Sequence, residues 1–462
     1  MTRAEWHVLS GWGESHHGFA RVFRPRSADE IAALLASAAR DGRRLALRGS
    51  GRSYGDAALL SRGDVLDLSA MDRIVSFDAA AGTVVCEPGV SIEKLWRTSL
   101  PAGLWPTVVP GTMRPTIGGC VAMNIHGKNH FKAGGFGEHV LEIELITPAG
   151  DRLTLSRERD GDLFRAAIGG FGLLGVVTSV KLAMHRVACG LLGVEARAVA
   201  SLASMIEEFE RRAGAADYLV GWVDCFDRRG RGVLHQANYL PADAVASPAA
   251  TFAPAVQDLP PRILGVVPRA AAPAALRPLA RPAGMKLLNA MKYRAAFIAG
   301  TQRFRQPHVR FAFLLDYIPG WKRIYEPGGL IQYQSFVPKE HALRVHTELL
   351  RLCRERGIVA WLGVYKKHRA CSFLMSHAVD GFSFAMDFPV TSANRERLWA
   401  LCREMDEIVL AAGGRFYLAK DLTATPDALR RAYPGLDEFR AIKRRLDPAG
   451  VLTSDLAIRL GV

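Results

Sequence analysis

The sequence predicts an α+β protein of two or three domains. Short candidate strands are interspersed with amphipathic helices over the first 186 residues, and 462 residues exceed the usual size of a single domain. With 49% hydrophobic and 23% charged residues, the composition is that of a globular protein with a sizeable core. No internal repeat or low-complexity tract points to another architecture.

The first part of the chain alternates helical and strand patterns. A helix is predicted between Arg24 and Gly42, because a capping-box pattern, Ser27–Glu30, precedes apolar residues at helical spacing. Leu45–Leu47 is predicted as a strand leading into a glycine-rich loop. Two hairpins, two helices and a closing strand follow, at 73–77 with 83–87, 140–147 with 152–155, 91–99, 162–167 and 176–182.

Residues 190–410 are a mixture of helices and strands with less regular patterning. Between 241 and 307 proline, alanine and arginine become frequent and periodicity fades, so we expect long, partly mobile loops there. The remaining elements are predicted helices at 202–212, 341–357, 398–412 and 427–431, and predicted strands at 311–315 and 331–337.

The net charge of +15 is unevenly distributed. Between Asp258 and Asp316 there are ten Lys or Arg residues and no acidic residue. No nucleic-acid-binding pattern accompanies them, so we expect no nucleic-acid partner. Anionic lipid headgroups or a phosphorylated lipid fit a basic, apolar segment better, and a solvated basic surface is the alternative.

Other features bear on the compartment. No apolar run is long enough to span a bilayer, and Met1–Arg21 lacks a signal-peptide pattern, so we expect a cytoplasmic protein without a transmembrane helix. Seven scattered cysteines without a Cys-x-x-Cys pair indicate free thiols in a reducing compartment and no metal cluster.

The stretch 111–130 combines turn residues with small apolar ones and ends in a polar cluster. Gly118 and Gly119 let backbone N–H groups approach a phosphate or a ring, and the alternative is a glycine-rich turn into a buried strand. His126-x-x-x-His130 has metal-ligand spacing only if helical. Gly127 and Asn129 argue against a helix, so we expect no metal site.

A second glycine-rich loop spans Gly49–Gly55. It nearly matches the Rossmann fingerprint, but its last spacing is one residue too long and no apolar helix follows directly. From the residues alone, a phosphate-binding loop and a tight turn without a ligand both remain open.

Several motifs together resemble a known family. Ile125–His130, Arg48–Asp56, Gln332–Gln334, Tyr417–Asp421 and Ser454-Asp455 resemble the flavoprotein subunit of decaprenylphosphoryl-β-D-ribose 2-epimerase, an FAD-dependent oxidase of the vanillyl-alcohol-oxidase superfamily. The resemblance runs nearly end to end and is weakest between about 190 and 310.

This resemblance implies a two-domain PCMH-type FAD-binding fold with an α+β substrate domain capping the flavin. Residues 1–190, completed by 412–462, would form the FAD-binding domain, and residues 191–411 the substrate domain, with its mobile basic loops near 241–307. The implied cofactor-binding residues are Arg48, Gly49, Ser50, Gly51, Arg52, Ser53, Tyr54, Gly111, Thr112, Thr116, Gly118, Gly119, Cys120, Asn124, His126, Gly127, Asn129, Ile168, Gly172, Gly175, Val176, Tyr417 and Lys420.

The resemblance also implies roles in catalysis. Lys420, His126 and Tyr417 would act at the flavin, with Lys420 either stabilising negative charge or serving as a general base of lowered pKa. Substrate binding would fall to Gln332, Gln334, Lys366, Ser383, Ala385 and Lys128; for the two glutamines the alternative is ordinary strand polarity.

Three positions depart from the pattern of the resemblance. Many superfamily relatives link a histidine covalently to the flavin at the position of Arg52, so we expect noncovalent FAD here. Well-known family members carry cysteine where Ala385 stands and asparagine where Ser383 stands. Because hydride transfer does not require that thiol, these changes affect substrate choice more than the reaction class.

The implied activity is oxidation of the 2-hydroxyl of a polyprenyl-phosphoryl-β-D-ribose to the keto sugar, by hydride transfer to flavin N5. The implied partners are this lipid-linked sugar, an NAD(P)H-dependent short-chain reductase that completes epimerisation to the arabinose form, and an anionic membrane surface at which the protein is peripherally associated. An oxidase of a soluble polyol or sugar lactone is the alternative, and a non-catalytic basic lipid- or nucleic-acid-binding protein a more remote one.

Overall fold

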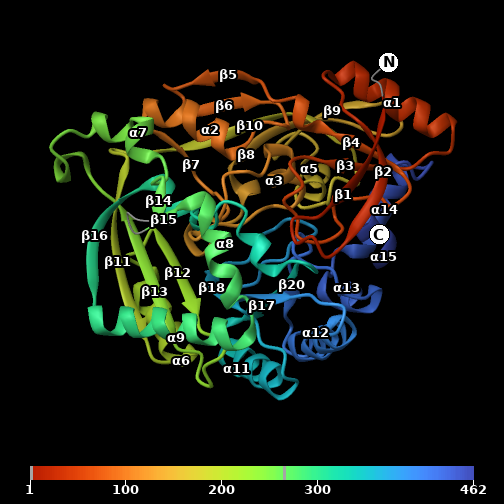
Figure 1. Ribbon diagram of the computed structural model, residues 1–462. Coiled ribbons are helices and arrows are strands. Elements are labelled where there is room, and N and C mark those ends of the chain that lie inside the picture. The colour runs from red at the N-terminus through yellow and green to blue at the C-terminus, as the bar shows by residue number, and fades with distance from the viewer. Residues whose placement is uncertain (1–3, 264–266) are drawn as a thin grey trace.

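The computed structural model describes residues 4–263 and 267–462. Three sheets of four, six and eight strands dominate it, with helices between and around them (Figure 1). The mixture of helices and sheets agrees with the predicted α+β class.

The four-stranded sheet has the order β1-β2-β4-β3. Its outer pair is antiparallel, whereas β2, β4 and β3 run parallel. The strands are β1 (Glu5–Ser10), β2 (His17–Phe23), β3 (Leu45–Arg48) and β4 (Asp64–Asp67). The helix α1 (Ala28–Arg40) connects β2 to β3, and the Ser27 side chain caps it by accepting a hydrogen bond from the Glu30 N–H, as the capping-box pattern predicts.

The six-stranded sheet is antiparallel, with the order β5-β6-β10-β8-β9 and β7 paired to β10. Both predicted hairpins are present, as β5 with β6 and β8 with β9. The strands are β5 (Ile74–Asp78), β6 (Thr83–Cys86), β7 (Leu104–Pro106), β8 (Val140–Ile146), β9 (Arg152–Ser156) and β10 (Val176–Arg186). The helices of this region are α2 (Ile92–Ser99), α3 (Ile117–Ala122), α4 (His130–Ala133) and α5 (Gly161–Ala167).

The eight-stranded sheet is antiparallel and has the order β16-β11-β13-β12-β18-β19-β17-β20. The helices α6 (Leu202–Ala213), α11 (Lys339–Glu355) and α12 (Arg395–Leu410) pack against its strands. The strands are β11 (Leu191–Val199), β12 (Tyr218–Val223), β13 (Gly232–Tyr239), β16 (Gln302–Pro307), β17 (Leu330–Pro338), β18 (Leu362–His368), β19 (Gly381–Pro389) and β20 (Arg415–Phe416).

The segment 241–307 differs from the expectation of long loops. It contains the 18-residue helix α9 (Pro282–Ala299), which lies across β11 and β13 (Figure 1). The pattern concealed this helix because its apolar residues are distributed around it instead of along one stripe. Shorter elements precede it: α7 (Pro254–Gln257), β14 (Arg262–Ile263), β15 (Val267–Pro268) and α8 (Ala272–Leu276).

The predicted strand at 311–315 is also wrong. Residues His308–Ala312 form the helix α10, followed by the 3-10 turn Leu314–Asp316. Four of the five α10 residues are buried, so the segment shows no helical period and resembles a buried strand in sequence.

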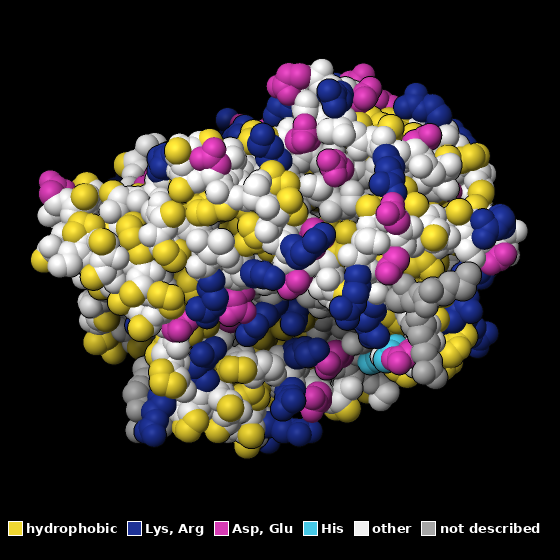
Figure 2. Space-filling model, turned by 90° about the horizontal axis from the view of Figure 1, so that it is seen from above, with side chains coloured by type: hydrophobic (Ala, Val, Ile, Leu, Met, Phe, Trp, Pro, Cys, Tyr) yellow, Lys and Arg dark blue, Asp and Glu magenta, His cyan; other side chains and the backbone are white. Residues whose placement is uncertain are grey.

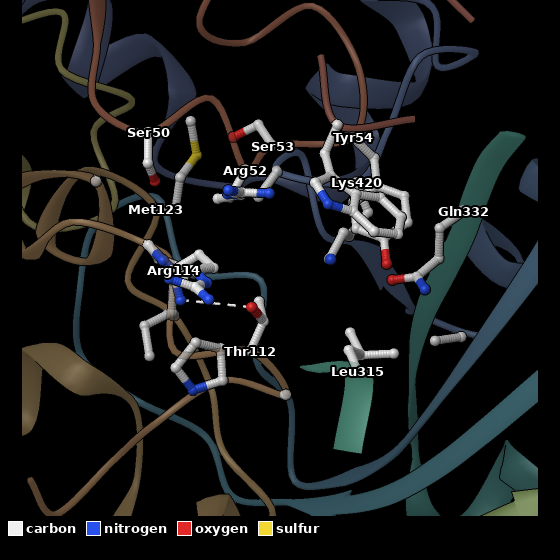
Figure 3. Close-up of a pocket in the computed structure, with 18 of the residues that line it drawn as sticks. Ser50, Arg52, Ser53, Tyr54, Thr112, Arg114, Met123, Leu315, Gln332 and Lys420 are labelled. Carbon is white, nitrogen blue, oxygen red and sulfur yellow. Dashed lines mark hydrogen bonds between the residues drawn. The ribbon is translucent and has the colours of Figure 1, made fainter. Parts of the chain in front are cut away.

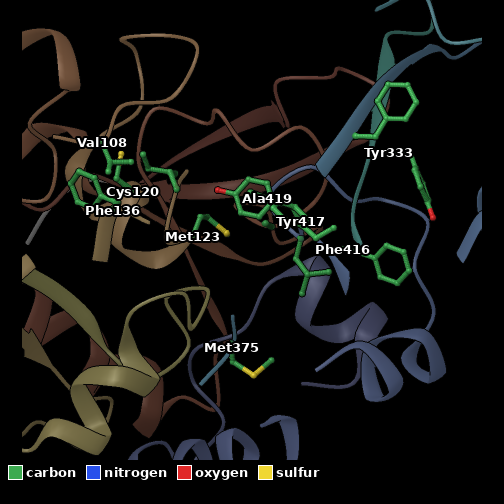
Figure 4. Close-up of a cluster of buried hydrophobic side chains, with 14 of the residues drawn as sticks. Val108, Cys120, Met123, Phe136, Tyr333, Met375, Phe416, Tyr417 and Ala419 are labelled. Carbon is green, nitrogen blue, oxygen red and sulfur yellow. The ribbon is translucent and has the colours of Figure 1, made fainter. Parts of the chain in front are cut away.

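The C-terminal segment returns to the four-stranded sheet. It contains α13 (Pro426–Ala432), α14 (Leu436–Leu446) and α15 (Asp455–Leu460), and Leu452 bridges to Leu45 of β3. The largest buried apolar cluster joins this segment to the sheets: Cys120, Phe136 and Met123 lie on one side of it and Phe416, Tyr417 and Ala419 on the other (Figure 4).

No helix in the described part of the chain is long and apolar enough to cross a membrane. On the face seen from above, lysine and arginine side chains gather in the lower centre of the view (Figure 2). The excess positive charge is therefore unevenly spread in the fold as well as in the sequence.

Candidate active site

A cavity of about 790 Å³ lies where the sheets meet, and it is lined by residues from all three of them and from α9. That volume is at the upper end of the range of about 300–1,000 Å³ typical of ligand pockets. The labelled side chains come from the loop after β3, from residues 112–123, from β17, from the turn at Leu315 and from the turn at Lys420, and they face a common space (Figure 3).

The glycine-rich loop after β3 forms one wall. Gly51 has a φ of 64°, in the left-handed region that favours glycine, and a Cβ on Gly49 would lie 2.1 Å from the Thr116 hydroxyl oxygen. Thr116 in turn caps α3 by accepting a hydrogen bond from Gly119 N, at 3.4 Å. The two glycine-rich segments are therefore in direct contact, and their glycines are required for this close approach.

At the end of the cavity formed by the glycine-rich loop, one cationic side chain lacks a hydrogen-bond partner. The Arg52 side chain has a buried Nε without a partner among the described residues, and burial, followed by the charge of Arg114, lowers the pKa of Arg52. Asp316, the neighbouring carboxylate, is already held by Thr112 Oγ1 at 2.8 Å and by Met113 N at 2.7 Å. An anion such as a pyrophosphate fits this end, because it would pair with a guanidinium that the protein leaves unmatched.

A second group of polar residues lines the cavity at β17 and β18. Lys366 Nζ lies 3.5 Å from His126 Nδ1, and Gln334 Nε2 lies 3.1 Å from His126 Nε2. The rings of His126 and Tyr417 meet edge to face with centroids 5.0 Å apart. Burial, reinforced by the charge of Lys366, lowers the pKa of His126 well below its usual range, so its ring is neutral.

Lys420 lies in a turn after β20. Its backbone N–H donates to Tyr417 O at 2.9 Å, and its Nζ lies 3.5 Å from the centroid of the Tyr54 ring. Burial lowers the pKa of the Lys420 ammonium, while the negative charge of Asp387 opposes that shift. Asp387 is itself fully buried, which raises the pKa of its carboxyl, and it accepts a hydrogen bond from Gln332.

Most of the expected site residues line this cavity. They are Arg48, Gly49, Ser50, Gly51, Arg52, Ser53, Tyr54, Gly111, Thr112, Thr116, Gly118, Gly119, His126, Lys128, Gly172, Gly175, Gln332, Gln334, Lys366, Ala385, Tyr417 and Lys420.

Seven expected residues do not line it: Cys120, Asn124, Gly127, Asn129, Ile168, Val176 and Ser383. They are buried behind the wall, where Asn124 accepts a hydrogen bond from Gly137 N, Asn129 donates to Thr107 O, and Ser383 lies 2.7 Å from a ring nitrogen of His368. Their positions support the lining residues from outside the cavity.

The structure adds residues that the sequence did not single out. Asp387 lies in the apolar segment 381–388, where an acidic residue within a strand was the available signal. Others, including Arg114, Asp316, Trp222, His235 and Lys292, line the cavity from segments without a recognisable motif.

The described residues contain no group of His, Cys, Asp or Glu that could hold a metal ion. The rings of His126 and His130 are 6.4 Å apart, and the chain between them is not helical. Gly127 and Asn129 thus lie outside a helix, as the sequence predicts, and the two histidines do not share a helical face.

The comparisons with known proteins bear on the cofactor. Residues 19–156 match a family model described as an FAD binding domain, and residues 384–460 match one described as D-arabinono-1,4-lactone oxidase. The glycine-rich loop, the unmatched Arg52 and these matches define an FAD-dependent oxidoreductase, and the expectation of FAD is confirmed.

Three relatives extend this result. Decaprenylphosphoryl-β-D-ribose oxidase of Mycolicibacterium smegmatis is 32% identical over 98% of this chain and 97% of its own. An uncharacterised protein of Streptomyces coelicolor is 33% identical over 81% of this chain and 100% of its own. A mitochondrial L-galactono-1,4-lactone dehydrogenase of Oryza sativa is 34% identical over 38% of this chain and 30% of its own. The chain belongs to the decaprenylphosphoryl-β-D-ribose oxidase family.

Proposed function

We propose that this protein uses noncovalent FAD to oxidise the 2-hydroxyl of a polyprenyl-phosphoryl-β-D-ribose to the 2-keto sugar, the first half of an epimerisation to the arabinose form. The observation that carries the proposal is the gathering of His126, Lys366 and Lys420 with Gln332 and Gln334 in one cavity, in a chain similar to a ribose oxidase over nearly its whole length.

The two parts of the fold suggest a division of labour. Residues 1–190 and 412–462 would hold the dinucleotide, since the glycine-rich loops, Arg52 and Lys420 belong to them. Residues 191–411 would cap the reacting end, because β17, β18 and β19 supply the side chains opposite Lys420. Arg52 has no means of forming the covalent bond that a histidine makes with flavin, which supports noncovalent binding.

When bound, FAD accepts the hydride from the carbon that carries the hydroxyl. The hydroxyl proton must leave as well, and we assign its removal to Lys420 Nζ. Burial lowers the pKa of this ammonium toward neutrality, and a general base works best when its pKa lies near the working pH. The negative charge of Asp387 raises the pKa of Lys420 and so favours the ammonium that forms on proton transfer.

Neighbouring side chains would orient the sugar. The neutral His126 ring is held between Lys366 and Gln334, which fixes its orientation relative to the Tyr417 ring. Burial lowers the pKa of Lys366 to about 8, which leaves it largely charged at neutral pH and suited to binding a sugar oxygen. Lys128, in the turn before α4, would contact another part of the same substrate. Ala385 leaves space where other members have a thiol, and Ser383 lies behind it.

Two partners complete the proposal. The keto product requires a reductant, for which we propose an NAD(P)H-dependent short-chain reductase. We also propose peripheral binding at an anionic cytoplasmic membrane surface, because α9 carries exposed apolar side chains in the segment without acidic residues, namely Leu287, Met291, Phe297 and Ile298.

The second candidate is an FAD-dependent oxidase of a soluble polyol or sugar lactone. The match of residues 384–460 to the D-arabinono-1,4-lactone oxidase model favours it. Anaerobic loss of the visible flavin absorbance separates the two. We expect bleaching by a polyprenyl-phosphoryl ribose and none by free ribose or galactonolactone, whereas the reverse pattern would establish the alternative.

A further inference from the structure

The lining of the cavity carries much more positive than negative charge. Its one acidic residue is Asp316, which already accepts hydrogen bonds from Thr112 and Met113. Its basic residues are Arg48, Arg52, Arg114, Lys128, Arg269, Lys292, Lys322, Lys366 and Lys420. A lining of this kind is suited to anionic ligands, and the pyrophosphate of FAD would engage only the loop end, at Arg52 and Arg114.

A separate basic centre lies at the wall made by β12, β13 and α9. Burial, followed by the positive charges of nearby Lys292 and Lys128, lowers the pKa of His235 to about 4, so its ring is a neutral hydrogen-bonding group. Lys128 Nζ donates to Phe311 O at 2.9 Å and to Ala312 O, which fixes its position. Within the described residues, neither Lys128 nor Lys292 pairs with a carboxylate.

The position of Lys292 follows from the geometry of α9. The cavity side of this helix is formed by Met285, Leu288, Asn289 and Lys292, at the spacing of one helical face. Buried Asn289 donates to Met285 O at 2.7 Å and to Trp361 O at 3.3 Å, which anchors the helix to the chain just before β18. Lys292 itself is exposed, so it lies where the cavity meets solvent.

The Lys292 ammonium is held but not neutralised. Its Nζ lies 4.2 Å from the centroid of the Trp222 ring, a cation–π contact that uses the ring face and no acceptor atom. An ammonium has three N–H donors, and the ring face does not occupy all of them, so donors remain for a ligand. A phosphate oxygen is the partner that such a cation lacks here.

We propose that Lys292, with Lys128 and His235, binds the phosphate group of the substrate, so that its lipid chain leaves the cavity past Met285 and Leu288. The recognised chemistry is a phosphate ester anion, and its assignment to the lipid-linked sugar rests on the function proposed above. Its wall belongs to the eight-stranded sheet and α9, whereas the glycine-rich loop Gly49–Gly55 follows β3 of the four-stranded sheet.

The test measures binding of farnesyl phosphate to the FAD-loaded protein by titration calorimetry. Lys292→Met should bind it roughly 10- to 100-fold more weakly, the loss expected for one charged hydrogen bond. Lys292→Arg should retain most of the affinity. Lys286→Met is the matched control, because it removes the same charge from an exposed position of the same helix outside the cavity, and it should bind as the native protein does.

Equal affinity of Lys292→Met and the native protein, at equal FAD content, would overturn the proposal. An equal loss of affinity in Lys286→Met would also overturn it, because the effect would then come from the net charge of the protein and not from the cavity. Inorganic phosphate added as a competitor identifies the source of the anion. If inorganic phosphate displaces farnesyl phosphate only at a much higher concentration than that of farnesyl phosphate, the site binds a lipid phosphate. If it does so at a similar concentration, the site binds free phosphate.

Kinetics then separate this site from the proposed function. With polyprenyl-phosphoryl ribose, Lys292→Met should raise KM by a similar factor and leave kcat unchanged, while anaerobic flavin reduction by a phosphate-free riboside should not respond to the substitution. If no ribose derivative reduces the flavin but Lys292→Met still loses farnesyl phosphate, the phosphate site stands and the proposed function fails.

Discussion

Replacing Lys420 by arginine separates the two roles open to this residue. Arginine keeps a positive charge, but its guanidinium does not give up a proton in proteins. If Lys420 Nζ is the base, Lys420→Arg should be nearly as inactive as Lys420→Ala. If the residue acts only through its charge, Lys420→Arg should retain much of the native kcat.

The expected loss follows from the environment of the lysine. At its ordinary pKa of 10.5, only about one lysine in 3,000 would be neutral at pH 7, and each unit by which burial lowers that pKa raises the neutral fraction about tenfold. A positioned general base contributes about 100- to 10,000-fold. We therefore expect kcat to fall by about 100- to 1,000-fold in Lys420→Ala and by a similar factor in Lys420→Arg.

The pH dependence of kcat/KM tests independently whether Lys420 must be neutral for the reaction. Because the base must be neutral, kcat/KM should rise with pH and level off at an inflection below 10.5, as the lowered pKa of Lys420 requires. The charge of Asp387 raises that pKa, so Asp387→Asn should move the inflection to lower pH.

The assay is anaerobic single-turnover reduction of bound FAD, with flavin content measured for every variant. Lys322→Ala is the control, since Lys322 also lines the cavity but is paired with Glu14 at 2.5 Å. A Lys420→Arg protein within a few-fold of the native rate would refute the base assignment, and an unmoved inflection in Asp387→Asn would refute the coupling.

Three further predictions follow from the site and the surface. Acid or heat precipitation should release intact FAD into the supernatant, whereas flavin retained on the precipitated chain would contradict noncovalent binding at Arg52. The native protein should not form an adduct with an electrophile generated at the flavin, because Ala385 has no thiol and burial raises the pKa of Cys120; Ala385→Cys should form one, visible by intact mass. The native protein should sediment with phosphatidylglycerol vesicles and less so as salt rises, given a Debye length of about 8 Å at physiological ionic strength. Ile298→Glu, at a side chain that is 83% exposed on α9, should weaken that binding, whereas Val75→Glu on β5 should change it only as much as one added negative charge does; equal binding of native protein to neutral vesicles would exclude electrostatics.

Local patterns in the sequence predict a helix or hairpin correctly where one face of the element is buried. The α1 helix and the β5–β6 and β8–β9 hairpins were predictable because turn residues and a single apolar face mark them. Sequence patterns do not predict α9 or α10. The first has apolar residues all round and the second is almost wholly buried, so neither shows the period of an amphipathic helix.

The residues of the candidate site also differ in how far the sequence predicts them. Contiguous motifs located the loop at Gly49–Gly55 and the turn that carries Lys420, since each lies in one short stretch. Asp387 and Lys292 could not be found this way, because their relevance depends on partners far along the chain: the coupling of Asp387 to Lys420, and the contact of Lys292 with Trp222. Pairing across sheets creates these sites, and no local pattern encodes it.

The return of the C-terminal segment to the N-terminal sheet imposes an order on the maturation of the enzyme. Arg459 binds both Asp56, at 2.8 Å, and Asp421, at 3.0 Å; Asp56 is buried and Asp421 is partly buried. During synthesis, Asp56 leaves the ribosome 403 residues ahead of Arg459, so its buried charge has no counterion until Arg459 emerges. A nascent chain that lacks Arg459 would have to bury that charge unpaired, at a cost of about 3–5 kcal/mol. Capture of FAD should therefore wait until Arg459 has been synthesised.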